Sequence, residues 1–407
     1  MKKIIISNFP VGPKFNGGAM TVWGIIKYFL DNNIDTFLIL ICNEDEKNNA
    51  RYNECVKILD TYKIDYEIFF YENKKIKFFH KLRNLLNALF FGNPDFFFPH
   101  HHKIKKLIEN KIKLFSKNQI FCYHFDVLSS CYDVENMDLI LGDFIHDPRI
   151  SRRFLEKRNL VFKFLDFIER LAGFKVMEKL TKKGKSINFF SYNYAKQFSK
   201  KIKKSNYLKT PIIDGDNFNP ENINDSEFNF LMVGHLQGTV TISSLVFLEK
   251  FIRKYEDYLL VNNVKFVVIG GNKLSNINKD LINKKNLINF CGESLSINDY
   301  YKKNNILLVP NEIDIGIRVR IITGLSFGAI IVTHSSNLKG IPELKNKSNC
   351  LIFSNENELI DIIKSLKDGK VSLDKIRINA KKTFHEHFYY KKSVKNILNI
   401  IGNDRQN

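Results

Sequence analysis

Short apolar runs alternate with amphipathic stretches through the first half of the chain. The stretches at 19–31 and 194–203 predict helices, and strands are predicted at 3–8, 35–42, 120–125, 139–144 and 187–191. Strands separated by helical stretches are typical of parallel βαβ units with both faces of the sheet covered. We therefore expect a doubly wound domain in this half.

A second series with the same pattern follows a turn-rich segment at 210–220, which predicts a linker. Beyond it, helices are expected at 241–254, 317–327 and 356–368, and strands at 229–233, 265–270, 287–291, 306–310 and 330–333. The predicted fold class is α/β, with two Rossmann-like doubly wound domains facing a cleft, and a ligand is expected at the carboxyl ends of both sheets. The expected bounds are 1–208 and 229–384 for the domains, 209–228 for the linker and 385–407 for a C-terminal helix.

The composition excludes a largely disordered chain. Hydrophobic residues make up 44% and charged residues 26% of the 407 residues, close to the averages of folded domains. The 63 Lys and Arg outnumber the 43 Asp and Glu, which gives a net charge of +20. Lysine is dispersed among Asn and Ile, as biased codon usage alone would produce; the alternative is attraction to an anionic surface of lipid or nucleic acid.

Cysteines and apolar segments bear on the compartment. None of the six cysteines stands in a Cys-x-x-Cys pair, so the sequence favours neither a disulfide framework nor a thiolate zinc site. The first apolar run is too short for a signal peptide, and no window approaches the ~18 apolar residues of a membrane span. We expect a cytoplasmic protein that does not cross a membrane.

Residues 78–121 are rich in Phe and Lys. Such a stretch is able to rest on a lipid surface, but the sequence favours a pair of amphipathic helices whose phenylalanines pack inward. The histidines at 100–102, and His385 with His387, do not predict a metal site, because side chains this close along the chain point apart.

Gly17 and Gly18 follow the first predicted strand and open a helix. Glycines let a backbone approach a ligand, and free amides at a helix N-terminus attract phosphate. The alternative is an ordinary tight turn, because the segment matches neither Gly-x-Gly-x-x-Gly nor a phosphate-binding loop.

The segment at 310–328 carries the strongest chemical signal. A predicted strand, a turn at Gly316 and a helix that begins with Arg318 and Arg320 bring together amide donors, a positive dipole end and guanidinium charge, which is the chemistry of a diphosphate site. Two arginines at a helix start oppose the dipole unless an anion binds there. The alternative is that they extend into solvent or pair with Glu312 or Asp314.

Ionisable residues also follow two predicted strands of the first half. Asp143, His146 and Asp147 come at the end of the strand at 139–144, and His124 and Asp126 end the preceding strand. The carboxyl ends of parallel strands meet at one edge of a sheet, where a ligand binds. The alternatives are that His146 caps the following helix and that His124 and Asp126 belong to ordinary loop packing.

Several landmarks occur in the order found in glycosyltransferases of the two-domain GT-B fold, and the chain resembles their retaining family 4 type. The landmarks are the Gly-Gly loop, a histidine after the strand at 139–144, the turn at 191–193, the linker, the loops at 233–234, 269–271 and 290–292, and the block at 316–333. The resemblance implies an acceptor domain in the first half, a nucleotide-sugar domain in the second, and a C-terminal helix that crosses back to the first.

The resemblance also implies roles for individual residues. His146, Asp143, Arg318 and Arg320 would act in catalysis. The implied donor-binding residues are Gly17, Gly18, Gly234, His235, Gly292, Glu293, Glu312, Gly316, Arg318, Arg320 and Thr323, and the implied acceptor-binding residues are His124, Asp126 and Asp147. No metal and no other cofactor is expected, because the arginines would neutralise the phosphates.

The chain departs from the family at two points. The family has two glutamates separated by seven residues, the second of which bonds the ribose, where this chain has Ile315 and Thr323. The basic pair that often follows the Val-Gly strand is represented by His235 alone. The implied donor therefore stays open among UDP-, GDP- and CMP-activated sugars.

The implied reaction is transfer of a sugar from a nucleotide donor to a hydroxyl of a cell-surface polysaccharide, lipopolysaccharide or other lipid-linked acceptor, with retention at the anomeric carbon. Arg318, Arg320 and the helix start would stabilise the leaving group, and His146 would orient the sugar during front-face attack. The expected partners are the nucleotide sugar, the acceptor and an anionic surface on the inner face of the cell membrane, with no nucleic acid. The alternatives are a nucleotide-sugar epimerase of the same fold and a non-catalytic basic module that binds nucleotide or nucleic acid.

Overall fold

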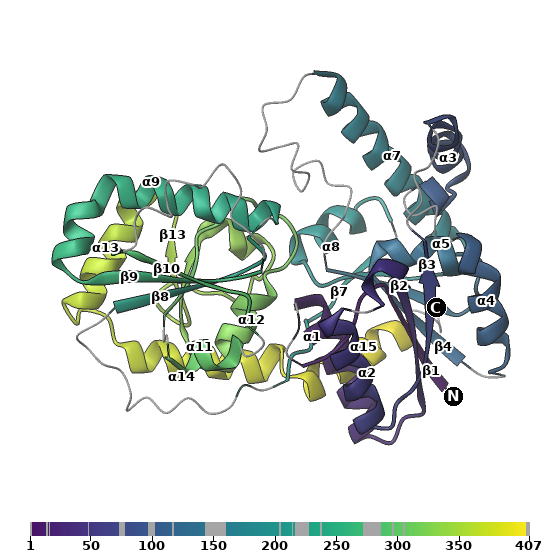
Figure 1. The fold of residues 1–407 in the computed structure, drawn as a ribbon, viewed down its shortest axis with the longest axis horizontal. Coiled ribbons are helices and arrows are strands. Elements are labelled where there is room, and N and C mark those ends of the chain that lie inside the picture. Colours follow the sequence, from purple (N-terminus) through teal and green to yellow (C-terminus); the bar gives the residue numbers. More distant parts are fainter. Residues whose placement is uncertain are drawn as a thin grey trace. The chain divides into compact units, whose positions relative to one another are not determined.

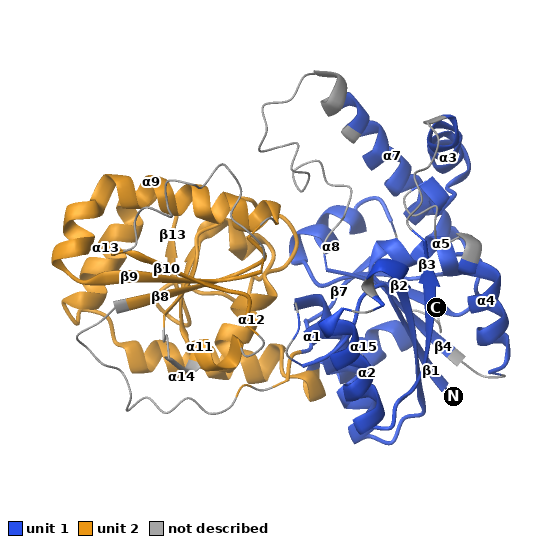
Figure 2. Ribbon diagram, viewed as in Figure 1, with its two compact units in different colours: residues 1–148, 156–211, 393–407 blue, residues 149–155, 212–392 orange. Residues whose placement is uncertain are grey.

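The computed structural model describes residues 2–13, 15, 17–47, 49–72, 78–96, 102–115, 118–142, 160–202, 205–213, 215, 228–236, 238–271, 286–294, 297–303 and 306–403. The chain divides into two compact units (Figure 2). Unit 1 holds residues 1–148, 156–211 and 393–407, and unit 2 holds residues 149–155 and 212–392. Each unit is built on one parallel sheet.

Unit 1 has a seven-stranded sheet with the order β3-β2-β1-β4-β5-β6-β7. Its strands are β1 (Lys2–Ser7), β2 (Thr36–Asn43), β3 (Asp65–Tyr71), β4 (Asn118–Tyr123), β5 (Met137–Leu141), β6 (Ile187–Phe189) and β7 (Ser205–Tyr207). Ile4 of β1 stands in register with Phe37 of β2 and Ile120 of β4. The three isoleucines of β1 are all buried, because a central parallel strand is covered on both of its faces.

The helices of unit 1 connect these strands (Figure 1). They are α1 (Gly17–Asp31), α2 (Ala50–Thr61), α3 (Phe78–Phe91), α4 (His102–Lys113), α5 (Leu128–Cys131), α7 (Leu160–Lys182) and α8 (Tyr192–Ser199), with the short 3-10 helices η1 (Glu44–Glu46), η2 (Pro94–Phe96) and η4 (Phe125–Val127). Trp23 and Phe29 of α1 are among the largest fully buried side chains. The last helix, α15 (Tyr390–Asn403), belongs to unit 1 from Ser393 onward.

Unit 2 has a six-stranded sheet with the order β10-β9-β8-β11-β12-β13. Its strands are β8 (Phe228–Val233), β9 (Val264–Ile269), β10 (Ile288–Gly292), β11 (Ile306–Val309), β12 (Ile330–His334) and β13 (Leu351–Phe353). Its helices are α9 (Thr239–Val261), α11 (Ile297–Lys303), α12 (Val319–Ser326), α13 (Glu356–Lys367) and α14 (Leu373–His387), with the 3-10 helix η7 (Ser335–Lys339).

Alternating strand residues of unit 2 pack against helices on opposite faces of the sheet. Leu308 and Val332 belong to the cluster that holds the apolar side chains of α9 and α13. Leu307 and Ile331 instead meet α12, where a Cβ on Gly324 would lie 2.9 Å and 2.6 Å from their side chains. The fold class predicted from the sequence, α/β with two parallel Rossmann-like sheets, is confirmed.

Three strands are absent from the sequence prediction, and each is an edge strand of its sheet. β3 and β13 are edge strands, and β7 is the edge on the far side of unit 1. β7 and β13 are each three residues long, too short for a periodicity to show. β3 is partly exposed along most of its length, so it lacks the buried apolar run by which the central strands were recognised.

The structure corrects the expectation for residues 78–121. Helices form there as predicted, as α3 and α4, but the phenylalanines of α3 whose side chains are described do not pack inward. Phe79, Phe90 and Phe91 are 81%, 75% and 67% exposed. The inward-packing interpretation is therefore wrong for α3.

Two further expectations concern metals and membranes. In the part of the chain that the structure describes, no three His, Cys, Asp or Glu side chains gather in a way that could hold a metal ion. His100 and His101 lie outside the described residues. None of the described helices is both long and apolar enough to span a bilayer.

Candidate functional site

Each sheet has a point where the chain changes the direction in which it adds strands. In unit 1 this point lies between β1 and β4, and in unit 2 it lies between β8 and β11. In open α/β sheets the loops separate at such a point, and ligands bind in the crevice beyond the carboxyl ends of the two strands. The polar residues at these two places are therefore the first candidates for a site.

In unit 2, Arg320 bridges the two strands at this point. Arg320 lies in the first turn of α12, which follows β11, and its Nη1 donates a hydrogen bond to the carbonyl of Val233, the last residue of β8. The guanidinium also lies beside Gly234, where a Cβ would stand 2.7 Å from Nη1. Burial lowers the pKa of Arg320. Because arginine keeps its proton throughout the working range of proteins, a desolvated positive charge faces this corner of the sheet.

Glycines let the neighbouring strand ends approach each other. A side chain on Gly270 would collide with the carbonyl of Gly234, so only glycine fits between the ends of β8 and β9. Gly270 N donates to the carbonyl of Gly292 at 2.9 Å, which adds the end of β10. A Cβ on Gly271 would lie 3.0 Å from the carboxylate of Glu293. The structure thus brings Gly234, Gly292 and Glu293 to one edge of the sheet, and the exposed His235 follows Gly234.

The loop after β11 carries Glu312, Asp314, Gly316 and Arg318. Arg318 is the N-cap residue of α12 and is buried, and its Nη2 donates to the carbonyl of Ile313 at 3.3 Å. Asp314 forms an ion pair with Lys339 at 2.8 Å, and Glu312 is exposed. Neither arginine extends freely into solvent, which removes that alternative. Gly316 has a φ of 64°, a conformation that glycine adopts without strain.

A buried polar network, which the sequence alone did not reveal, holds this loop in place. Asn337 of η7 donates to Thr333 Oγ1 at 2.9 Å, and Asn311 donates to Asn337 Oδ1 at 3.1 Å and to the carbonyl of Ile313 at 3.0 Å. A Cβ on Gly340 would lie 2.5 Å from the carbonyl oxygen of Gly316. These buried hydrogen bonds favour one geometry of the loop, because breaking them leaves buried polar groups unpaired.

Ile315 and Thr323 stand where the resembled family has glutamates, and both pack inside the protein. Ile315 is buried, and the hydroxyl of Thr323 donates to the carbonyl of Val319 at 3.1 Å, one turn earlier in α12. Thr323 is itself 5% exposed. This chain therefore presents no carboxylate at either position.

In unit 1, Asp126 joins the loops of β1 and β4. Asn8, just after β1, donates to Asp126 Oδ2 at 2.9 Å, and His124 Nδ1 lies 3.0 Å from Asp126 Oδ1. His124 has a φ of 82°, and a histidine held in this region of backbone space is an indicator of a functional loop. The sequence prediction named His124 and Asp126; it missed Asn8, whose position after a buried strand was the available signal.

The other candidates of unit 1 are only partly described. Gly17 and Gly18 open α1, as predicted, and Thr21 donates to the carbonyl of Gly17 at 2.8 Å. Asp143, His146 and Asp147 lie outside the described residues. Their catalytic and acceptor-binding roles stay predictions.

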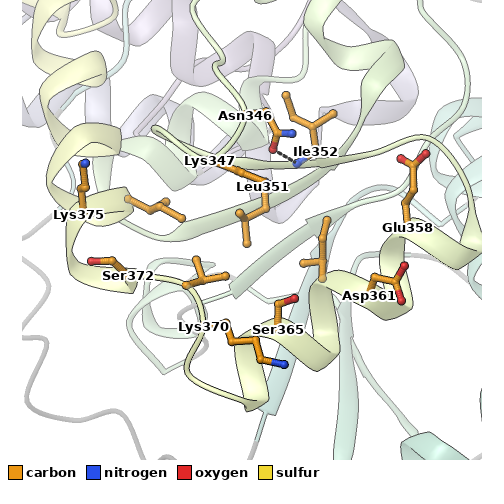
Figure 3. A pocket seen from close by; sticks show the side chains of 13 residues that line it. Asn346, Lys347, Leu351, Ile352, Glu358, Asp361, Ser365, Lys370, Ser372 and Lys375 are labelled. Atoms are coloured by element: carbon orange, nitrogen blue, oxygen red, sulfur yellow. Dashed lines mark hydrogen bonds between the residues drawn. The ribbon is translucent and has the colours of Figure 1, made fainter.

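A hollow in unit 2 lies apart from these strand ends. It is lined by β13, α13 and the start of α14, and Figure 3 shows Glu358, Asp361, Lys370 and Lys375 around its rim. Asn346 Oδ1 accepts a hydrogen bond from Ile352 N at 3.0 Å (Figure 3). Because β13 is the edge of the sheet, this hollow is remote from the point between β8 and β11 and is not the donor-site candidate.

Comparison with known sequences identifies a match to one protein family within unit 2. Residues 227–368 match the family described as Glycosyl transferases group 1. A search of curated protein sequences gave no significant match.

The whole chain is similar to several solved structures. It superposes on a glycosyltransferase from Rickettsia africae with a TM-score of 0.66 at 14% identity, covering 100% of this chain and 99% of that one. HepE from Anabaena, solved with UDP, gives a TM-score of 0.65 at 12% identity, over 99% and 100% of the two chains. A TarM mutant from S. aureus, solved with fondaparinux, α-GlcNAc-glycerol and UDP, gives a TM-score of 0.66 at 12% identity, over 98% of this chain and 99% of that one. These likenesses establish the fold.

Proposed function

We propose that this glycosyltransferase, whose second unit carries a Glycosyl transferases group 1 domain in a GT-B fold, moves a sugar from a UDP-activated donor to a hydroxyl of a cell-surface glycan or lipid-linked acceptor. We also propose that the anomeric configuration is retained. HepE and TarM were solved with UDP, and HepE also with UDP-glucose, which supports UDP over GDP and CMP.

The observation that carries the proposal is the position of Arg320. Its guanidinium connects the first turn of α12 to the carboxyl end of β8, residues that are 87 positions apart in the sequence. A diphosphate bound beyond this edge would meet a positive charge that burial keeps from being screened by water. It would also meet the free amides at the start of α12 and the backbone of Gly234.

The proposed reaction breaks the bond between the anomeric carbon and the β-phosphate oxygen and forms a bond from that carbon to the acceptor oxygen. Negative charge develops on the departing phosphate oxygen, and Arg320, Arg318 and the start of α12 stabilise it. On the same face, the acceptor hydroxyl passes its proton to the departing β-phosphate oxygen as the new bond forms. His146 orients the sugar in this scheme. Guanidinium groups supply the positive charge, so the proposed reaction uses no metal ion.

The acceptor in this proposal binds at the corresponding point of unit 1. Asp126 is 8% exposed and accepts from Asn8, and a carboxylate is a good acceptor for the hydrogen bond of a sugar hydroxyl. His124, held by its unusual backbone conformation, stands beside it. The pair therefore supports recognition of a polar, hydroxyl-rich acceptor.

The proposal is tested by replacing Arg320 and measuring nucleotide binding by calorimetric titration. Arg320→Met keeps most of the apolar stem and removes the charge. Loss of a charge-assisted contact worth about 1.5–3 kcal/mol weakens binding by roughly tenfold to 150-fold, and we expect UDP affinity to fall within this range and turnover to fall with it. GDP and CMP, titrated alongside, are expected to bind the natural chain more weakly than UDP.

Arg253→Met is the matched control. Arg253 lies on α9 in the same unit, with its side chain 73% exposed and paired with Glu249 at 2.9 Å, so UDP affinity should not change. Arg318→Met is measured alone and together with Arg320→Met. If Arg320→Met, Arg318→Met and the double variant all fold and bind UDP as tightly as the natural chain, the diphosphate site proposed at α12 does not exist.

A further inference from the structure

The helix α3 turns an apolar stripe toward solvent. Phe79, Leu82, Leu86 and Phe90 recur at intervals of three or four positions, which places them on one face of a helix at ~100° per residue. Their exposed fractions are 81%, 42%, 44% and 75%. A row of large apolar side chains in water is unusual, because scattered single residues are the norm on a protein surface.

The opposite face of α3 meets the protein with small or polar side chains. Asn84 and Ala88 are buried there, and Asn84 Nδ2 donates to the carbonyl of Asp95 in η2 at 3.5 Å. A helix that packs on a core normally buries its apolar face. In α3 no large apolar side chain is fully buried among those described, and Leu85 and Leu89 are only half-buried, so the exposed stripe is not explained by the core of unit 1.

The neighbouring helix α7 also exposes an apolar stripe, in its first half. Phe164, Phe167 and Leu171 follow the same helical spacing and are 61%, 55% and 43% exposed, whereas the second half of α7 is held on unit 1 by buried side chains such as Val176 and Leu180. The two helices lie side by side in unit 1 (Figure 1). Lys179 Nζ of α7 donates to the carbonyl of Phe91 at the end of α3 at 2.7 Å. We call these two stripes together the α3–α7 surface.

The charge of α3 is entirely positive. Its charged residues are Lys81 and Arg83, both exposed, and its sequence contains no Asp or Glu. Arg83 follows Leu82 on the same face as the stripe, and Lys81 precedes it. Apolar and aromatic side chains flanked by cations are the combination that enters the headgroup region of an anionic bilayer, where the rings displace water and the cations meet phosphate.

We infer that the α3–α7 surface docks on an anionic lipid bilayer. The positive charge of α3 complements negative headgroups, and the chain as a whole carries a net charge of +20, which attracts it toward such a membrane before the apolar side chains insert. This occupant accounts for both the exposed phenylalanines and the absence of acidic residues on α3.

The surface is connected to the acceptor candidates of unit 1. α3 packs on η2, and Ser129 of α5 donates to the carbonyl of Pro94 in η2 at 3.0 Å. α5 directly follows η4, which contains Asp126. Resting on the proposed function, this continuity means that a docked unit 1 holds its acceptor site near the lipid surface, where a lipid-linked acceptor is found.

The inference is tested by flotation of the full chain with lipid vesicles. Vesicles of phosphatidylcholine mixed with phosphatidylglycerol are expected to carry the protein, vesicles of phosphatidylcholine alone to carry much less, and rising salt to weaken binding. Phe79→Ser with Phe90→Ser, and separately Phe164→Ser with Phe167→Ser, should each weaken partitioning about tenfold or more. Lys81→Gln with Arg83→Gln should weaken it about tenfold on the anionic vesicles only.

Ile378→Ser is the matched control, because Ile378 is 68% exposed on α14 of unit 2 and its loss should leave vesicle binding unchanged. Thermal unfolding confirms that each variant is folded. UDP titration separates this inference from the donor site, because only the donor site fails if the natural chain does not bind UDP. Absence of binding to anionic vesicles overturns the inference, as do phenylalanine variants that float like the natural chain. A concentration-dependent dimer that the same variants abolish, without vesicle binding, would assign the surface to a second copy.

Discussion

The contact between Gly340 and Gly316 offers a direct test of how the donor loop is held. Gly340 follows η7 with φ and ψ of −88° and −29°, values that any residue adopts, so Gly340→Ala introduces no backbone strain. The added Cβ would lie 2.5 Å from the carbonyl oxygen of Gly316. Real Cβ atoms stay at least 3.0 Å from such an atom, so the two backbones must separate by about 0.5 Å.

The size of the effect follows from what this movement displaces. Overpacking in a well-packed region costs about 1–3 kcal/mol, which for a unit of about 150–250 residues, such as unit 2, lowers the melting temperature by about 2–4 °C per kcal/mol. Gly316 lies two residues before Arg318, the N-cap of α12. A misplacement of 1 Å in a positioned site costs about 100-fold in activity, so a shift of half that size should weaken UDP binding by about tenfold.

Thermal unfolding and UDP titration are measured on the same preparation of Gly340→Ala. Gly402→Ala is the control, because a Cβ at Gly402 in α15 meets open space, and we expect it to match or slightly exceed the natural chain in stability. If Gly340→Ala melts and binds UDP like the natural chain, the close approach of the two loops does not exist in solution. If it is destabilised and yet binds UDP normally, the loop is packed as described but is not the donor site.

Two further predictions address the polar groups on either side of the proposed reaction. Asn337→Ala removes the partner of Thr333 and Asn311, so the free energy of unfolding measured with urea should fall by about 1–3 kcal/mol, together with some loss of UDP affinity. Asn357→Ala, at the exposed start of α13, is the control and should cost much less. Equal losses in the two variants would contradict the role of the network. Asp126→Asn keeps an oxygen for Asn8 but removes the negative charge. Steady-state kinetics should then show turnover with acceptor reduced about tenfold or more, while UDP affinity is unchanged. Normal acceptor kinetics would mean that Asp126 only holds the loop after β4 against the loop after β1.

Much of the fold follows from local pattern. The central strands β1, β8 and β11 contain apolar runs, because a strand covered on both faces has few polar positions. The carboxyl ends of such strands meet at one edge, so His124, Asp126 and the arginines of α12 were identifiable as site candidates, whereas Gly234 was named only through the family resemblance. The edge strands β3, β7 and β13 were not, because a short or half-exposed strand carries too few apolar positions to show a period.

The orientation of a helix is a different kind of information. The spacing of Phe79, Leu82, Leu86 and Phe90 indicates an amphipathic helix whichever way the helix faces, and the usual inference is that the apolar side is buried. In α3 the buried side is Asn84 and Ala88. Only the packing of α3 against η2 and α7 reveals this, because periodicity defines the two faces of a helix but not which of them contacts the protein.

The sequence by itself determined that this chain forms two parallel sheets and where along it the strand ends with chemistry would fall. The tertiary structure decided which side chains meet there. Arg320 reaches Val233 across 87 positions, and Asn8 reaches Asp126 across 118. The physical reason is that sheet order, set by the pairing of β1 with β4 and of β8 with β11, brings distant loops together, and no local pattern records that pairing.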